Sequence, residues 1–152
     1  MAARLYIALR SDLLGMSPGR AAAQASHGTS TFHEKFNSLP ETSLTYSLKR
    51  AVNEWKEEAE GFGTAIVLKA TYGEILDLQD QAVLARAENS DTSKDNFYFR
   101  RIIDPQYFYK GPGELFEAKD VLTGAVVFIP DESREVEEVG RLFEKIYALP
   151  LF

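Results

Sequence analysis

The feature that most constrains this chain is a short apolar strand that leads, through a glycine-containing loop, into the start of a helix. Residues 5–9 form a continuous apolar run, which is typical of strands buried on both faces. Ser17 and Pro18 then predict a helix start, since serine can cap the free amides and proline fits the first helical position. A helix N-terminus is therefore expected at the carboxyl end of a strand, where α/β proteins bind ligands and anions are favoured.

The predicted first helix has two different faces. At about 100° per residue, one side carries small and aromatic side chains that are expected to pack on a sheet. The opposite side is polar and is either a solvated face or part of a site. The packing side is Ala21, Ala22, Ala25, Thr29, Phe32 and Phe36, and the polar side is Arg20, Gln24, His27 and Thr31.

The remaining elements follow from periodicity and from turn signals. A break at residues 37–40 precedes a helix that is expected from residue 42 or 43 to 60. A buried strand over residues 64–68 and a helix over residues 72–87 come next, followed by an exposed loop over residues 88–96. Residues 97–103 predict a strand that Asp104-Pro105 ends, and residues 106–120 an irregular segment. A last strand is expected over residues 124–129, before a helix capped by Asp131 or Ser133.

This order, β-α-α-β-α-β-β-α, predicts a single layered α/β domain over residues 1–152. Apolar strands with little alternation need cover on both faces. We therefore expect a mixed four-stranded sheet flanked by helices on both faces.

Composition narrows the possible functions. Cysteine is absent and histidine occurs only at positions 27 and 33, so thiolate chemistry is excluded and no spacing of metal ligands is found. No apolar run approaches the roughly 20 residues that span a membrane, and no secretory signal precedes the first strand. The chain is therefore expected in the cytoplasm. Its net charge of −6 disfavours nucleic-acid binding in general, but the acidic excess lies after residue 60, so a local basic patch before it is possible.

Two segments resemble the opening of the type-2 peptidyl-tRNA hydrolase family. Residues 5–13 read Leu-Tyr-Ile-Ala-Leu-Arg-Ser-Asp-Leu, and residues 19–27 read Gly-Arg-Ala-Ala-Ala-Gln-Ala-Ser-His. The family pattern is an apolar strand, Arg-x-Asp-Leu, a glycine-containing turn and Gly-Lys-x-Ala-Ala-Gln-x-Ser-His. The resemblance implies an enzyme that cleaves the ester between a peptide and the 3′ end of tRNA, using no metal or organic cofactor.

The resemblance also assigns site residues by position. Arg20 stands where the family has its active-site lysine, and Asp104 matches the acid at the end of the third strand. Asp104 would orient or deprotonate water, Arg20 and Gln24 would donate to the oxyanion, and His27 would bind the ribose or relay a proton. Ser26 lies off the polar stripe, which favours a packing or capping role over that of a nucleophile. The catalytic set is thus Arg20, Gln24, His27 and Asp104, and the candidates for substrate binding are Arg10, Asp12, Ser26, Lys49, Arg50 and Thr123.

Departures from the family pattern leave a second interpretation open. Arginine at position 20 keeps the charge but cannot act as a general base. The family's short Ala-Gly-x-Thr-Gln turn after the aspartate is replaced by a longer segment, whose Tyr107, Phe108 and Tyr109 would either stack on an unpaired 3′ base or form a core plug or partner surface. The alternative is a non-catalytic protein on the same fold that binds a protein or a nucleotide-like ligand. A homodimer is compatible with either function.

Overall fold

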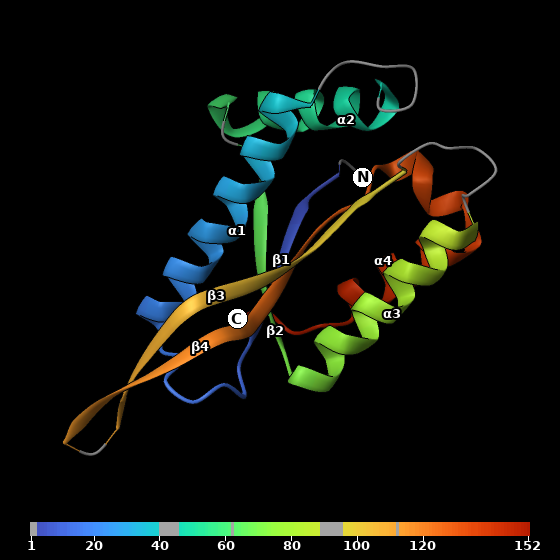
Figure 1. Ribbon diagram of the computed structural model, residues 1–152. Coiled ribbons are helices and arrows are strands. Elements are labelled where there is room, and N and C mark those ends of the chain that lie inside the picture. The colour runs from blue at the N-terminus through green and yellow to red at the C-terminus, as the bar shows by residue number, and fades with distance from the viewer. Residues whose placement is uncertain (1–2, 40–45, 62, 89–95, 112) are drawn as a thin grey trace.

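The computed structural model describes residues 3–39, 46–61, 63–88, 96–111 and 113–152, and it centres on a mixed four-stranded sheet (Figure 1). The strand order is β2-β1-β4-β3. β1 runs parallel to β2, whereas β4 is antiparallel to both of its neighbours. The predicted fold class and element order are confirmed. The strands are β1 (Leu5–Arg10), β2 (Ala65–Ala70), β3 (Tyr98–Gly111) and β4 (Glu114–Phe128).

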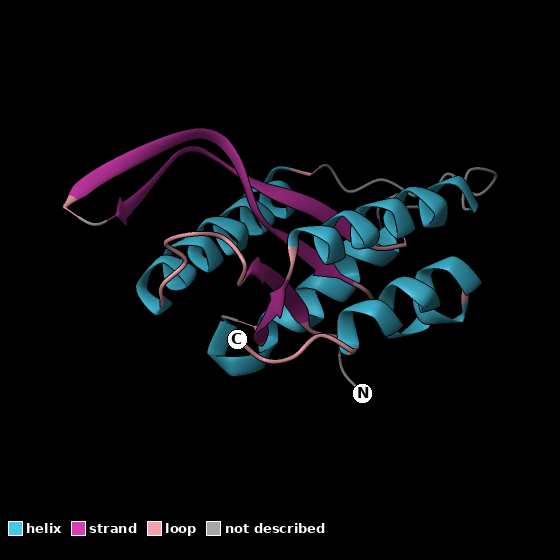
Figure 2. Cartoon of the chain, turned by 90° about the horizontal axis from the view of Figure 1, so that it is seen from below, coloured by secondary structure: helices cyan, strands magenta, loops and turns pink. Residues whose placement is uncertain are grey.

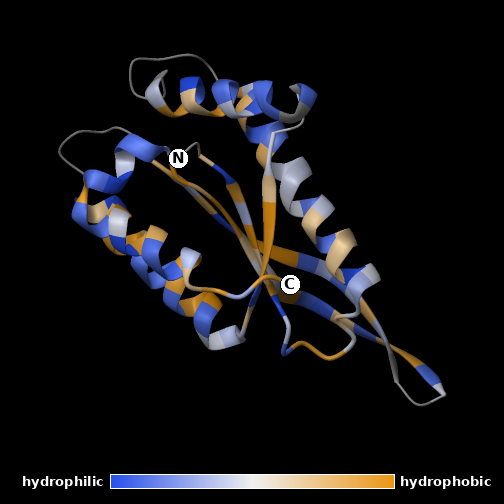
Figure 3. Ribbon diagram, turned by 180° about the vertical axis from the view of Figure 1, so that it is seen from behind, coloured by the Kyte–Doolittle hydropathy of each residue, from blue (hydrophilic) through white to orange (hydrophobic). Residues whose placement is uncertain are grey.

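Helices cover both faces of this sheet (Figures 1 and 2). One apolar cluster joins α1 and α2 to the sheet, and a second joins α3 and α4 to the other face. Successive residues of β1 enter the two clusters in turn, with Ile7 in the first and Ala8 in the second. Burial on both sides is why β1 shows no alternation in the sequence; the apolar strands are orange in Figure 3. The helices are α1 (Pro18–Ser38), α2 (Tyr46–Glu57), α3 (Tyr72–Glu88) and α4 (Glu137–Tyr147), with short 3₁₀ turns at Glu58–Gly61 and Asp131–Glu135.

The start of α1 is as predicted, but its buried face is rotated. Ser17 Oγ accepts a hydrogen bond from the Arg20 amide at 3.3 Å. Gln24 is buried and Ala22 is exposed, the reverse of the expected faces. The cause is Gly28, at which a Cβ would lie 2.7 Å from Val126 Cγ2. This glycine lets the helix lie close to the sheet, and Gln24, one turn before it on the same buried side, faces inward.

The segment expected to be irregular is instead a two-stranded arm. β3 continues through Asp104-Pro105 to Gly111, and β4 begins ten residues before the expected strand start at 124. The pairing with β4 passes over Pro105, between the pairs Asp104–Val121 and Gln106–Lys119, so the ladder continues without its missing N–H. Beyond Ile103 the two strands pair only with each other and project from the body of the molecule (Figure 2). We call residues 103–111 and 114–122 the β-arm.

Two sequence predictions concern residues that the structure does not describe. The expected start of the second helix at residue 42 or 43 lies outside the described residues, and so does nearly all of the loop expected at 88–96. Within the described ranges, no helix is both long and apolar enough to cross a membrane.

Candidate active site

Asp104 lies where α1 crosses the base of the β-arm. Gln24 Nε2, from α1, donates to Asp104 Oδ2 at 2.8 Å. The backbone amide of Gln106 donates to Asp104 Oδ1 at 2.9 Å. Each carboxylate oxygen thus accepts one hydrogen bond and keeps lone pairs for a further donor such as water. Asp104 is partly exposed, so its carboxylate can reach a substrate.

A β-bulge supplies the next member of this network. The pairing register of β3 and β4 shifts between Ile102 and Ile103, which leaves Thr123 as the extra residue on β4. Thr123 is fully buried, and its hydroxyl donates to Gln24 Oε1 at 2.8 Å. The amide oxygen of Gln24 therefore faces Thr123 and the amide nitrogen faces Asp104. The signal for Thr123 in the amino-acid sequence was weak, because a bulge depends on the pairing of two distant strands.

Arg20 lies over the ring of Tyr107, with its guanidinium carbon 5.3 Å from the ring centroid. The Tyr107 hydroxyl donates to the carbonyl oxygen of Leu14 at 3.1 Å, and the side chain is only 1% exposed. Of the two roles considered for this tyrosine, the structure shows the plug, since it fixes the β-arm to the β1–α1 loop. A hollow opens at this point, lined by residues 12–17 and Arg20.

Several charged side chains of the site affect the pKa of Tyr107. Burial raises the pKa of Tyr107, the positive charges of Arg20 and Arg10 oppose this rise, and the negative charge of Asp104 adds to it. Arg20 and Asp104 therefore both lie within electrostatic reach of the same phenol.

Arg10 and Asp12 hold the end of β1 in place. Arg10 Nε lies 3.0 Å from Asp12 Oδ1, and Arg10 Nη1 donates to the Leu122 carbonyl oxygen at 3.1 Å. The Tyr72 amide, at the start of α3, donates to Asp12 Oδ2 at 3.0 Å. Burial alone would raise the pKa of Asp12, but these hydrogen bonds and the charge of Arg10 outweigh it and lower the pKa. Both side chains thus have structural partners beside the hollow.

Two other predicted site residues on α1 make no hydrogen bond to Asp104. His27 and Ser26 are exposed on α1, and for neither is a hydrogen bond to Asp104 found. A second hollow, lined in part by Thr31, Arg100 and Arg101, runs between α1 and β3. It adds cationic side chains on the side of Asp104 away from the β-arm.

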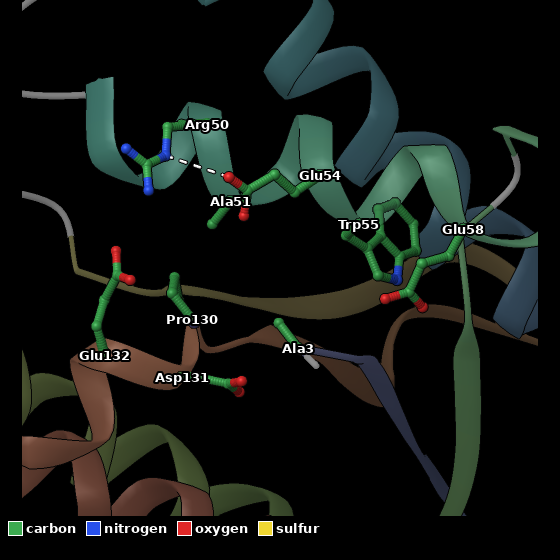
Figure 4. A pocket seen from close by; sticks show the side chains of 9 residues that line it. All are labelled: Ala3, Arg50, Ala51, Glu54, Trp55, Glu58, Pro130, Asp131 and Glu132. Atoms are coloured by element: carbon green, nitrogen blue, oxygen red, sulfur yellow. Dashed lines mark ion pairs between the residues drawn. The ribbon is translucent and has the colours of Figure 1, made fainter. Parts of the chain in front are cut away.

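Lys49 and Arg50 are not brought to Asp104. They lie on α2, which follows the far end of α1 (Figure 1). Lys49 Nζ donates to the Leu39 carbonyl oxygen at 2.9 Å, and Arg50 pairs with Glu54 at 3.2 Å beside an acidic pocket (Figure 4).

Comparison with known proteins places the chain in a family. The family model described as Peptidyl-tRNA hydrolase PTH2 matches residues 3–94, which run from the start of β1 past the end of α3. A search among curated proteins gives no match. Asp104, Thr123 and the β-arm lie outside the matched residues, whereas the strand, loop and helix that carry Arg20 and Gln24 lie inside them. The matched part covers more than half of the chain, and the chain therefore belongs to the type-2 peptidyl-tRNA hydrolase family.

Proposed function

We propose that this protein hydrolyses the ester that joins a peptide to the 3′ end of tRNA, with the Asp104 carboxylate as the group that activates water. The observation that carries this proposal is the hydrogen-bonded series Thr123–Gln24–Asp104, which fixes a partly exposed carboxylate at the base of the β-arm.

The reaction assigns one task to each side chain. Asp104 accepts a proton from water as its oxygen attacks the ester carbonyl. Arg20 stabilises the resulting oxyanion as a fixed cation, a task that needs its charge and no proton transfer. The carbon–oxygen bond to the ribose then breaks, and the departing oxygen takes the proton from Asp104. Gln24 is expected from the sequence to donate to the oxyanion and Thr123 to bind substrate; in this proposal both act instead as positioning residues, because both are buried.

We propose that the RNA approaches along α1. His27 is exposed one helical turn beyond Gln24 and would contact the terminal ribose or relay a proton. Arg100 and Arg101 line the hollow between α1 and β3, where they would meet phosphates. Lys49 and Arg50 would take part only for an RNA that runs the length of α1, about 30 Å at 1.5 Å per residue. Arg10 and Asp12 would support this surface through the contacts that hold the end of β1.

The further elements of this proposal follow from the family and the fold. We propose that residues 1–152 work as one domain in the cytoplasm, with peptidyl-tRNA as partner and without a metal or organic cofactor. Among the described residues, no group of three histidine or carboxylate side chains is arranged to hold a metal ion.

The test is cleavage of peptidyl-tRNA by purified protein. Asp104→Asn is expected to lower kcat by about 10²–10⁴-fold, the usual contribution of a general base. The matched control is Asp120→Asn in the β-arm, where φ is +52° and asparagine is well tolerated. Arg20→Lys is expected to stay within about tenfold of the parent chain, and Arg20→Ala to fall well below it. Equal rates for Asp104→Asn and the control would refute the assignment.

A second function is binding without cleavage, which the β-arm favours because it replaces the short turn that the family has next to the aspartate. No peptide release at high enzyme concentration, together with a saturable complex that Asp104→Asn leaves unchanged, would identify this function instead.

A further inference from the structure

Among the described residues, no strand other than β4 pairs with β3, so its outer edge is unpaired along the β-arm. The strand order places β3 at the edge of the sheet, so it pairs with β4 on one side only. The amide of Gln106 bonds to the Asp104 carboxylate, so it faces away from β4. Since alternate residues of a strand direct their peptide groups to opposite sides, the peptide groups of Phe108 and Lys110 also face outward. The arm thus presents a row of main-chain donors and acceptors that begins two residues from Asp104.

The β-arm and the β1–α1 loop carry exposed apolar side chains. Phe108 and Leu115 on the arm are 37% and 67% exposed, and Leu14 on the β1–α1 loop is 69% exposed. A long exposed edge of this kind is a template for another extended chain.

The charged side chains differ on the two sides of Asp104, and each side suits a different half of the proposed substrate. Residues 103–122 contain four carboxylates and two lysines, which is unfavourable for phosphates. Arg100 and Arg101 precede Asp104 on the same strand and line the other hollow. An ester held at Asp104 would therefore place its RNA on the arginine side and its peptide on the arm side.

We propose that the edge of β3 from Gln106 to Lys110 binds the peptidyl part of the substrate as an added β-strand, an inference that rests on the proposed function. The esterified carboxyl end of the peptide lies at Asp104, so the peptide runs toward its amino end as β3 runs toward the arm tip, and the two strands are antiparallel. The edge accommodates about four peptide residues, at roughly 3.3 Å each. Recognition through main-chain hydrogen bonds does not depend on side chains, which suits an enzyme whose peptides have many sequences.

The test uses an uncleavable probe in which N-acetyl-tetraalanine is joined by an amide to 3′-amino-3′-deoxyadenosine. On the full chain, it is expected to bind at least tenfold more tightly than the monoalanyl probe and to slow hydrogen exchange of the Phe108 amide. N-methylation of successive peptide nitrogens should weaken binding with a period of two, because only alternate nitrogens face β3. Equal affinity of the two probes, or methylation effects without alternation, would overturn the proposal.

Two arm variants sharpen this result. Phe108→Pro removes the outward N–H and is expected to abolish the gain in affinity with peptide length. Phe108→Ala removes the ring, keeps the N–H and should preserve most of that gain. Should the proline variant fail to fold, the N-methylated probes on the unaltered chain still decide the question.

Other occupants of the edge give different outcomes. If a second copy of the chain paired there, the sedimenting mass would rise with protein concentration and the Phe108 amide would be protected without any probe, which would overturn the proposal. Protection by a short RNA that carries no peptide would do the same. Binding is measured without cleavage, so a failure of the hydrolase assay is read separately from a failure of this inference.

Discussion

Replacing Thr123 by valine tests whether the bulge residue sets the orientation of Gln24. The two side chains have nearly the same volume, so Thr123→Val removes one hydroxyl without opening a cavity. Thr123 is 0% exposed and Gln24 is 4% exposed, which keeps water from replacing the lost donor. An unpaired buried amide oxygen costs about 1–3 kcal/mol, and we expect a destabilisation of that size.

The Thr123→Val substitution should also affect the positioning of the Asp104 carboxylate. Without the Thr123 donor, the bond from Gln24 Nε2 to the carboxylate, 2.8 Å long, is the contact that still orients the amide. The Gln24 amide oxygen then has lost its donor, and the amide can rotate about the bond that remains, which loosens the position of Asp104. A loss of about 1–3 kcal/mol in positioning corresponds to a decrease in kcat of about five- to 150-fold, with a smaller change in KM, because neither buried residue contacts the substrate.

The assay for stability is urea unfolding followed by the fluorescence of Trp55, the one tryptophan of the chain, which is 2% exposed in the core. Thr123→Ser keeps the hydroxyl and should recover much of the loss. In a double-mutant cycle, Thr123→Val should cost little in a Gln24→Leu background, where the amide to be satisfied is gone. A stability of Thr123→Val within about 0.5 kcal/mol of the parent chain, or full additivity with Gln24→Leu, would refute the reasoning.

Three further changes have expected outcomes. Gly28→Ala should destabilise the chain in urea unfolding, because overpacking of about 1–3 kcal/mol exceeds the gain of about 1 kcal/mol in helix propensity. Gly19→Ala on the same helix, where a Cβ meets nothing within 4 Å, should stabilise the chain. Equal effects of the two substitutions would contradict the close approach of α1 to the sheet at Gly28. Burial and the charge of Lys56 lower the pKa of His33. The stability that depends on neutral His33 is therefore complete above about pH 6.5 and declines at lower pH. His33→Gln should reduce this decline in stability between about pH 7.5 and 5.5, and an unchanged decline would exclude His33 as its cause. Tyr107→Phe removes one hydrogen bond to the β1–α1 loop and should cost about 0.5–1.5 kcal/mol, with faster amide exchange in that loop as the second readout.

Local chemistry explains the parts of the fold that were predicted correctly. The N-terminus of α1 follows from Ser17 and Pro18, whose effect depends only on their neighbours. The sheet with helices on both faces follows from unbroken apolar strands. Arg20 and Gln24 were proposed as site residues because they match the family motif and share the polar side of the predicted helix; the family match over residues 3–94 covers their positions, and their roles stay a prediction.

The β-arm shows where local reasoning failed. Asp104-Pro105 reads as a strand end, because proline cannot donate to a neighbouring strand. The pairing of β3 with β4 continues on both sides of Pro105, with Asp104 opposite Val121 and Gln106 opposite Lys119, and only the tertiary structure reveals this pairing. The prediction of an irregular segment at 106–120 was wrong for this reason.

The amino-acid sequence by itself determined the elements, their order and the helix that carries Arg20, since these depend on periodicity and capping within a few residues. Only the tertiary structure decided that Gln24 is buried against Asp104, that Thr123 reaches it from a bulge and that the arm edge stays open. Each of these depends on contacts across 80 to 99 positions of the chain or on strand order, and packing sets such contacts independently of local propensity.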